Sequence, residues 1–128
     1  MQLNAIDVFS GAGGLSLGLR RAEFNVMLAV DSWQLAVDTY TKNFEHPAVC
    51  ADLGHLSPDE LLKYIDFLPR QIDLLAGGPP CQGFSVQRIG ADVDQRNDLV
   101  LRFAIMVAGL RPRAFLMENV IGLTGYRG

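Results

Sequence analysis

The residue best suited to chemistry is Cys81, which follows the rigid segment Gly-Gly-Pro-Pro at 77–80. Two prolines fix their own φ angles and restrict the residues before them, so the short thiol side chain is presented in a defined way. A thiol that is partly exposed and partly ionised is a nucleophile. We therefore interpret Cys81 as a candidate nucleophile, and Cys50 as a small buried hydrophobic residue. Two cysteines suggest neither a disulfide framework nor a zinc site, and no metal is expected.

A carboxyl group that could assist such a nucleophile is Glu118. It ends the apolar run 114–117, so we expect it to be buried, protonated and able to donate a hydrogen bond to a base. Asn119 stands beside it and adds hydrogen-bonding capacity. The pair predicts an acid near the end of a strand.

A glycine-rich turn supplies the third set of candidate residues. Gly11 and Gly13 let the backbone approach a ligand closely, and a helix after the turn would offer free N–H groups to a carboxylate. Asp31, twenty residues later, could accept from ribose hydroxyls, and Asp52 follows the next strand. The pattern indicates a cofactor that contains adenosine. Ser16 stands where the dinucleotide fingerprint requires a third glycine, which weakens a nicotinamide or flavin interpretation.

These residues need a scaffold, and the hydrophobic pattern supplies one. Apolar runs that predict strands alternate with segments of helical spacing, which is typical of an α/β fold with a doubly wound parallel sheet. Ligands of such sheets bind outside the carboxyl ends of the strands. We expect one domain, residues 1–128, with strands at 4–9, 26–30, 47–51, 72–76 and 114–117, helices at 15–22, 32–43, after Ser57 and at 96–109, and a long loop at 81–95.

Composition limits the partners. The 128 residues carry a formal charge of −3, whereas a self-sufficient duplex binder usually shows a basic face. The N-terminus does not resemble a secretory leader, and acids interrupt the early apolar stretches well short of a membrane span. We expect a cytoplasmic globular protein with no membrane partner.

Three segments resemble one family. DVFSGAGGLSLGL at 7–19, GGPPCQGFS at 77–85 and FLMENVIGL at 115–123 are similar, in order and spacing, to DNA cytosine carbon-5 methyltransferases, and DQRNDL at 94–99 is similar to a further family segment. The resemblance implies a Rossmann-like methyltransferase fold, S-adenosylmethionine as cofactor, and DNA methylation of the restriction–modification kind.

The resemblance also implies roles for particular residues. Cys81 would attack carbon 6 of a cytosine flipped out of double-stranded DNA, while Glu118 holds or protonates ring nitrogen 3. Gln82, Ser85 and Arg88 would contact the nucleic acid from a loop that closes over it. The cofactor would be bound by Phe9, Gly11, Gly13, Asp31, Trp33, Asp52, Pro80, Asn97 and Leu99. Phe9 and Trp33 could instead be core aromatics.

The resemblance covers the N-terminal, cofactor-binding and cysteine-bearing part of the family's catalytic domain, without its target-recognition region. With the family strand order 3-2-1-4-5, the strand at 114–117 would be an exposed apolar edge that invites a complementary chain or self-association. We expect the isolated chain to bind DNA weakly and to be inactive alone. Three alternatives remain: a transfer-RNA cytosine-5 methyltransferase, an inactive cofactor-binding fragment, and a dinucleotide-dependent oxidoreductase.

Overall fold

The computed structural model describes residues 1–80 and 97–119, with the backbone alone for residues 97 and 98. Five parallel strands form one sheet in the order β3-β2-β1-β4-β5, which confirms the predicted topology. The elements are β1 (Asn4–Val8), α1 (Gly14–Arg21), β2 (Asn25–Asp31), α2 (Gln34–Asn43), β3 (Ala48–Cys50), α3 (Pro58–Leu62), β4 (Leu74–Gly77), α4 (Asn97–Leu110) and β5 (Ala114–Met117).

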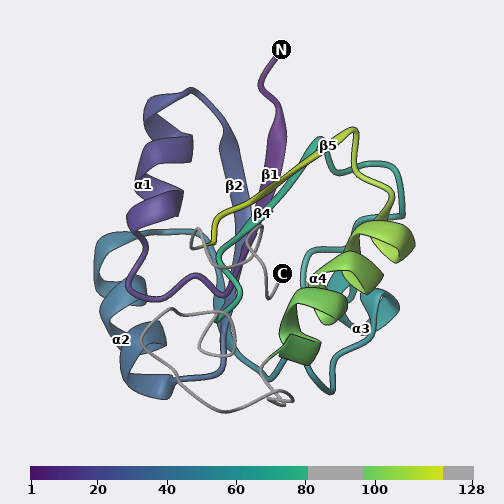
Figure 1. Ribbon diagram of the computed structural model, residues 1–128. Coiled ribbons are helices and arrows are strands. Elements are labelled where there is room, and N and C mark those ends of the chain that lie inside the picture. Colours follow the sequence, from purple (N-terminus) through teal and green to yellow (C-terminus); the bar gives the residue numbers. More distant parts are fainter. Residues whose placement is uncertain (81–96, 120–128) are drawn as a thin grey trace.

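Helices cover both faces of the sheet (Figure 1). The helices α1 and α2 lie on one face, and α3 and α4 lie on the other. Because side chains alternate along a strand, β1 serves both faces. Ile6 and Val8 join the larger core beneath α3 and α4, and Ala5 joins a smaller cluster with Leu19 of α1. Every residue of β1 after Asn4 is buried, as expected of a central parallel strand.

A bulge in β2 distributes its side chains between the two faces. Ala5 pairs with Val26 and Ile6 pairs with Leu28, so Met27 is an extra residue opposite β1. Residues two apart on a regular strand share a face, but here Val26 packs beside Ala5 and Leu28 packs beside Ile6. The bulge therefore places Val26 and Leu28 on opposite faces of the sheet, Val26 in the smaller cluster and Leu28 in the larger core.

Helix α4 buries a narrow stripe. Phe103, Met106 and Leu110 are buried at helical spacing and face the larger core. Ile105 is also apolar, but its side chain is 37% exposed. This residue lies off the stripe set by 103, 106 and 110. Gly109 packs closely against α3, where an added Cβ would lie 2.3 Å from Pro58 Cγ.

The sheet reverses its order of strand addition between β1 and β4. The chain adds β2 and β3 on one side of β1 and then returns to add β4 and β5 on the other. Connections on the two sides leave the carboxyl ends of β1 and β4 in opposite directions, and open α/β sheets bind their ligands at such a point. The segments at these strand ends are 9–13, 31–33, 51–57, 78–80 and 118–119. They hold most of the candidate residues.

Candidate active site

The turn after β1 has a backbone that only particular residues tolerate. Phe9 and Gly11 both have a φ of 55°, and Gly13 has a φ of 109°. A Cβ on Gly13 would lie 2.4 Å from Phe44 Cε2, so this position requires glycine for both its backbone angle and its packing. Gly13 is also the N-cap of α1, which has neither a side-chain cap nor an acid in its first turn. The first N–H groups of α1 can therefore receive a carboxylate.

Asp31 ties this turn to the next strand end. Its Oδ2 accepts a hydrogen bond from Gly11 N at 2.9 Å, and its Oδ1 accepts one from Trp33 N at 2.9 Å. Each carboxylate oxygen has a second lone pair, so Asp31 can still accept from ribose hydroxyls. Sequence reasoning gave Asp31 a ligand role but missed this structural one. Its two bonds hold the glycine turn and the start of α2 in fixed relation.

A buried polar chain runs beneath the glycine turn. Ser16 Oγ donates to Asp7 Oδ2 at 2.6 Å, and Tyr40 Oη donates to Ser16 Oγ at 2.6 Å. Because the one Tyr40 hydroxyl proton is used there, the contact with His46 Nε2 requires the ring N–H to donate to the tyrosine oxygen. Each group in the chain thus donates to the next one, from His46 through Tyr40 and Ser16 to Asp7. The sequence signal was Ser16 itself, which replaces a glycine of the dinucleotide fingerprint.

Burial controls the protonation of this chain. Asp7 has no exposed surface, and burial raises its pKa to about 6 against the opposing hydrogen bond from Ser16. Its Oδ1 is buried without a hydrogen bond from the described residues. Burial also raises the pKa of Tyr40 to about 12, and it lowers the pKa of His46. The network is therefore held by neutral Tyr40 and neutral His46 next to a carboxyl that is costly to ionise.

The candidate adenosine residues differ in exposure. Trp33 is 64% exposed at the N-terminus of α2, which does not fit a core aromatic and leaves its ring open to stacking. Asp52 is exposed beyond the end of β3. Phe9 is half-buried: part of its side chain packs against the larger core, and the rest is accessible to solvent. The three residues stand at the ends of three neighbouring strands, β3, β2 and β1.

The ends of β4 and β5 lie close together. Glu118 N donates to Gly77 O at 2.9 Å, and Asn119 Nδ2 lies 3.5 Å from Pro79 O. A Cβ on Gly78 would be 2.8 Å from Glu118 Oε2, so glycine there makes room for the carboxylate. We expected Glu118 to be buried, but it is exposed. That expectation was wrong because β5 is at the edge of the sheet, where three of its four residues are exposed.

Several candidate residues lie elsewhere. The predicted nucleophile Cys81 and the predicted nucleic-acid contacts Gln82, Ser85 and Arg88 fall outside the described residues. Pro80 is exposed at the end of the segment that leads to them. The backbone of Asn97 begins α4, and Leu99 is half-buried on its first turn. The structure thus brings the cofactor candidates and Glu118 to the side of the sheet where the strands have their carboxyl ends.

Cys50 was expected to be buried, but it is an exposed free thiol at the end of β3. Its Sγ lies 3.5 Å from Ser32 O, and the residue pairs with Asp31 across the sheet. The expectation was wrong because β3 is only three residues long and is an edge strand, at the opposite edge of the sheet from β5. An edge strand this short leaves its last side chain open to solvent.

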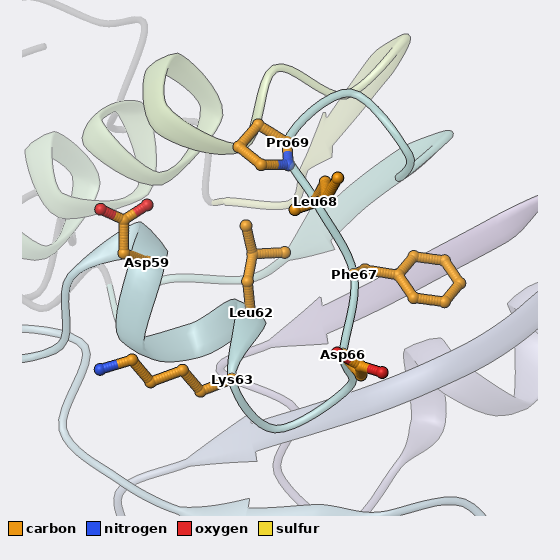
Figure 2. A pocket seen from close by; sticks show the side chains of 7 residues that line it. All are labelled: Asp59, Leu62, Lys63, Asp66, Phe67, Leu68 and Pro69. Atoms are coloured by element: carbon orange, nitrogen blue, oxygen red, sulfur yellow. The ribbon is translucent and has the colours of Figure 1, made fainter.

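A pocket of about 350 Å³ lies away from the candidate residues, against α3 and the segment that follows it (Figure 2). It is lined by Asp59, Leu62, Lys63, Asp66, Phe67, Leu68 and Pro69, and none of the candidate residues is among them. Among residues 1–80 and 97–119, no group of three or more His, Cys, Asp or Glu side chains could hold a metal ion. In the same part of the chain no helix is long and apolar enough to cross a membrane.

Comparison with known proteins places this arrangement in a family. Type II methyltransferase M1.HphI of Haemophilus parahaemolyticus is 46% identical over 128 residues, covering 96% of this chain and 34% of the relative. Type II methyltransferase M.AgeI of Thalassovita gelatinovora is 41% identical over 129 residues, covering 98% of this chain and 30% of the relative. The chain therefore spans about a third of the length of these curated relatives.

A solved structure agrees with the sequences. The crystal structure of a protein described as a DNA modification methyltransferase encoded within a prophage (E. coli) matches with a TM-score of 0.84 and 41% identity. The match covers 98% of this chain and 34% of that one. A sequence model described as C-5 cytosine-specific DNA methylase matches residues 3–127. The chain belongs to the C-5 cytosine-specific DNA methylase family.

Proposed function

We propose that this chain forms the cofactor-binding and cysteine-bearing part of a DNA cytosine carbon-5 methyltransferase that uses S-adenosylmethionine. The observation that carries the proposal is the convergence of the glycine turn, Asp31, Asp52 and Glu118 at the carboxyl ends of four of the five parallel strands. Family membership supports the same chemistry. Because the chain spans about a third of the length of these two curated relatives, we propose the activity for a larger assembly that contains it.

The residues present fit the cofactor. The uncapped N-terminus of α1, after Gly11 and Gly13, offers N–H groups to its carboxylate. Asp31 has free lone pairs for the ribose, and Trp33 offers an open ring face near the adenine. Asp52 is exposed and able to accept from the adenine amine. Pro80, Asn97, Leu99 and Phe9 would complete the pocket. When bound, the cofactor supplies an electrophilic methyl group on a sulfonium.

Cys81 and Glu118 are proposed to act on opposite parts of the cytosine ring. The thiolate forms a bond to carbon 6, and Glu118 stabilises the electron pair that moves toward ring nitrogen 3. Carbon 5 then takes the methyl group. A base such as water then takes the carbon-5 proton, the electrons of that C–H bond re-form the double bond between carbons 5 and 6, and the sulfur leaves carbon 6 as a thiolate, which frees the cysteine. The contact of Asn119 with Pro79 supports this pairing, because it holds the Glu118 segment beside the residues that lead into Cys81.

DNA binding is proposed to need more than these residues. The formal charge of −3 does not favour a polyanion, and Gln82, Ser85 and Arg88 alone would give few phosphate contacts. At the sheet edge, Phe115 is 60% exposed and Leu116 is 46% exposed. An apolar strand edge of this kind pairs readily with another chain. We propose that a complementary polypeptide, or a second copy, covers β5 and supplies the remaining DNA contacts and target recognition.

The alternatives are less well supported. Matches above 40% identity to proteins named as Type II or DNA modification methyltransferases favour DNA over transfer RNA. Cys81 and Glu118 are both present, which argues against an inactive fragment. The hydroxyl of Ser16 bonds to Asp7 where an oxidoreductase fingerprint requires glycine, which argues against a dinucleotide cofactor.

Cofactor binding gives the first test. Trp33 is the chain's one tryptophan, so its fluorescence reports directly on the proposed adenine position. We expect saturable quenching by S-adenosylmethionine, and calorimetry should show binding about tenfold weaker in Asp52→Ala, consistent with loss of one charge-assisted hydrogen bond. Asp59→Ala, an exposed acid on α3, is the matched control. A folded chain that binds no cofactor would contradict the proposed site.

Methyl transfer gives the second test. S-adenosylmethionine with a tritiated methyl group is supplied with duplex DNA, with transfer RNA, or with neither, in the presence of a relative's C-terminal portion as the complementary polypeptide. We expect label in DNA alone and its loss in Cys81→Ser and Glu118→Gln. Label in transfer RNA would favour the RNA alternative. Label in DNA that persists in Cys81→Ser would contradict the covalent route.

A further inference from the structure

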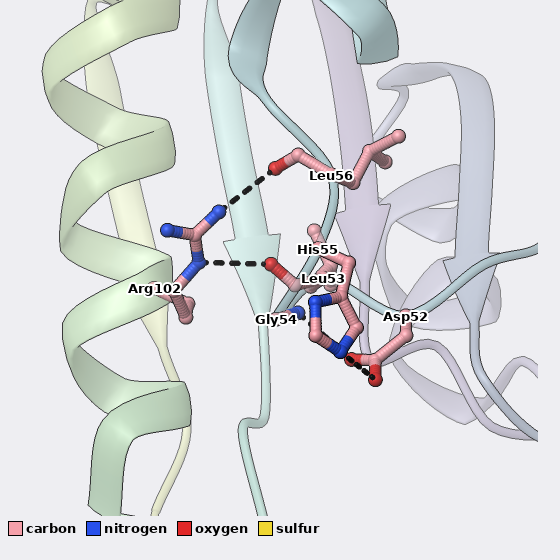
Figure 3. Close-up of polar contacts among 6 residues, drawn as sticks. All are labelled: Asp52, Leu53, Gly54, His55, Leu56 and Arg102. Atoms are coloured by element: carbon pink, nitrogen blue, oxygen red, sulfur yellow. Dashed lines mark hydrogen bonds and ion pairs between the residues drawn. The ribbon is translucent and has the colours of Figure 1, made fainter.

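Arg102 makes a long-range connection that the proposed chemistry does not use. It lies on α4 and is half-buried, and its side chain reaches the segment between β3 and α3 (Figure 3). The Nε atom donates to Leu53 O at 3.0 Å, and Nη2 donates to Leu56 O at 3.2 Å. Two carbonyls that are 46 and 49 residues away in sequence thus share one guanidinium.

The segment that Arg102 contacts carries Asp52. Asp52 Oδ1 accepts from Gly54 N at 2.8 Å, and Asp52 O accepts from His55 N at 2.9 Å, which folds residues 52–55 into a tight turn. The side chains of Leu53 and Leu56 are buried in the larger core. The turn is therefore fixed by buried side chains on its inner side and by Arg102 along its main chain.

The chemistry of the contact favours arginine. A guanidinium presents several N–H donors in one rigid plane, so it can hold two carbonyls at a set separation, whereas a lysine ammonium acts as a single point. Leu53, whose carbonyl Arg102 contacts, is the residue directly after Asp52. Fixing this carbonyl restricts the main chain that directs the Asp52 side chain, while the Asp52 carboxylate itself remains exposed. Arg102 touches neither a candidate reacting atom nor Asp52.

We propose that Arg102 is a positioning residue for the adenine end of the cofactor pocket, acting through the carbonyls of Leu53 and Leu56 on the turn that carries Asp52. This inference rests on the proposed function, because it assumes that Asp52 receives the adenine amine. Arg102 lies one turn after Leu99, another proposed cofactor residue. Helix α4 would therefore both line the pocket and hold its opposite wall in place.

Discrimination at the adenine amine tests the proposal. Binding of S-adenosylmethionine and of its analogue with hydrogen in place of the adenine amino group is measured for the wild type, Arg102→Met and Arg102→Lys. Arg102→Met should bind S-adenosylmethionine about tenfold more weakly and lose most discrimination against the analogue, with part of it restored in Arg102→Lys. Arg21→Met, an exposed arginine at the end of α1, should match the wild type. An affinity loss with unchanged discrimination would show general destabilisation and overturn the proposal.

A double-mutant comparison and a cofactor-free readout separate this proposal from the proposed function. In an Asp52→Ala background, Arg102→Met should change affinity less than about twofold, because both changes remove the same interaction. Amide hydrogen exchange at Gly54 and His55 should accelerate in Arg102→Met without cofactor, while circular dichroism shows an intact fold. Unchanged exchange would overturn the inference even if the cofactor binds. Failure of the wild type to bind, with accelerated exchange in the variant, would instead count against the cofactor site and against an adenine role for Arg102.

Discussion

Asp7 is a buried carboxyl group whose ionised form destabilises the folded chain. It lies on the central strand with no exposed surface, and one of its oxygens has no hydrogen bond from the described residues. Its partner Ser16 joins α1 to β1, and Tyr40 joins α2 to the same network by donating to Ser16. The carboxyl therefore organises the layer beneath the glycine turn, and its ionisation opposes burial. A charge placed here should make stability depend on pH.

The pH dependence follows from the folded-state pKa of Asp7, which burial raises from 3.8 to about 6. Between these values the folded chain binds more protons than the unfolded chain, so the Asp7 contribution to stability is complete below pH 3.8 and is lost as pH rises through about 6. The lowered pKa of His46 acts in the opposite direction as pH falls below its ordinary value. Comparison of variants is needed to isolate Asp7.

Asp7→Asn should be more stable than the wild type at pH 8, by about 1–3 kcal/mol, because it removes the buried charge while an amide oxygen can still accept from Ser16. The advantage should shrink toward pH 4, where Asp7 is protonated. Urea unfolding at several pH values measures this difference, with Asp38→Asn, an exposed acid on α2, as control. A difference that stays constant from pH 4 to pH 8 would show that Asp7 does not titrate as argued.

Gly13 offers a sharper residue-scale test. Gly13→Ala forces a side chain onto a φ of 109° and into contact with Phe44, so it should cost about 2–4 kcal/mol. Gly18→Ala on α1 is the matched control, because its Cβ would meet nothing within 4 Å, and helix propensity should add about 0.5–1 kcal/mol of stability. Thermal unfolding of both variants checks the contrast. Equal effects of the two changes would rule out a special requirement at Gly13.

At the scale of elements, the sequence predicted what local patterns determine. The five strands, their parallel arrangement and the glycine turn before α1 are as expected from these patterns, and the strand order is the one that the family resemblance implied. The bulge at Met27 and the exposure of the Glu118 side chain were not predictable in this way. Each depends on which distant residue packs opposite, and no periodicity within a segment contains that information. The hydrogen bonds that Asp31 accepts from Gly11 and Trp33, and those that Arg102 donates to Leu53 and Leu56, were not predicted for the same reason.

The start of α3 is a local feature that the sequence did predict. Ser57 Oγ accepts from Glu60 N at 3.1 Å and Pro58 occupies the first turn, so this five-residue helix depends on its cap. Ser57→Ala should destabilise the protein by about 1 kcal/mol, and Ser57→Asp should restore it because aspartate caps equally well. Chemical denaturation of the three proteins measures this. Equal loss in both variants would mean that the hydroxyl has another role.

At the scale of the whole molecule, the two edges of the sheet are unequal. The β3 edge ends in the polar surroundings of Cys50 and Asp52, whereas the β5 edge exposes Phe115 and Leu116. Phe115 keeps one edge-to-face contact with Phe103, at a centroid distance of 6.3 Å, and Leu116 is on the opposite side of the strand. Association should therefore depend on Leu116 more cleanly than on Phe115, which also supports α4.

Leu116→Lys should reduce self-association without lowering the melting temperature by more than a few degrees, because a charged edge residue opposes strand pairing. Sedimentation velocity over a range of protein concentrations measures the effect. Leu101→Lys, which changes an exposed apolar residue of α4, is the control for a general gain in solubility. If both lysine variants reduce association equally, the contact does not run through the β5 edge.

The two hydrogen bonds accepted by Asp31 also bear on the kinetics of ligand capture. A turn that is already held at Gly11 and Trp33 has little conformational entropy left to lose when a molecule settles beside it. Its association rate can then approach that set by diffusion to an open surface, and the heat-capacity change of binding should reflect the ligand's buried area with little contribution from loop ordering. Asp31 would in this way govern how quickly a molecule is captured as well as how firmly it is held.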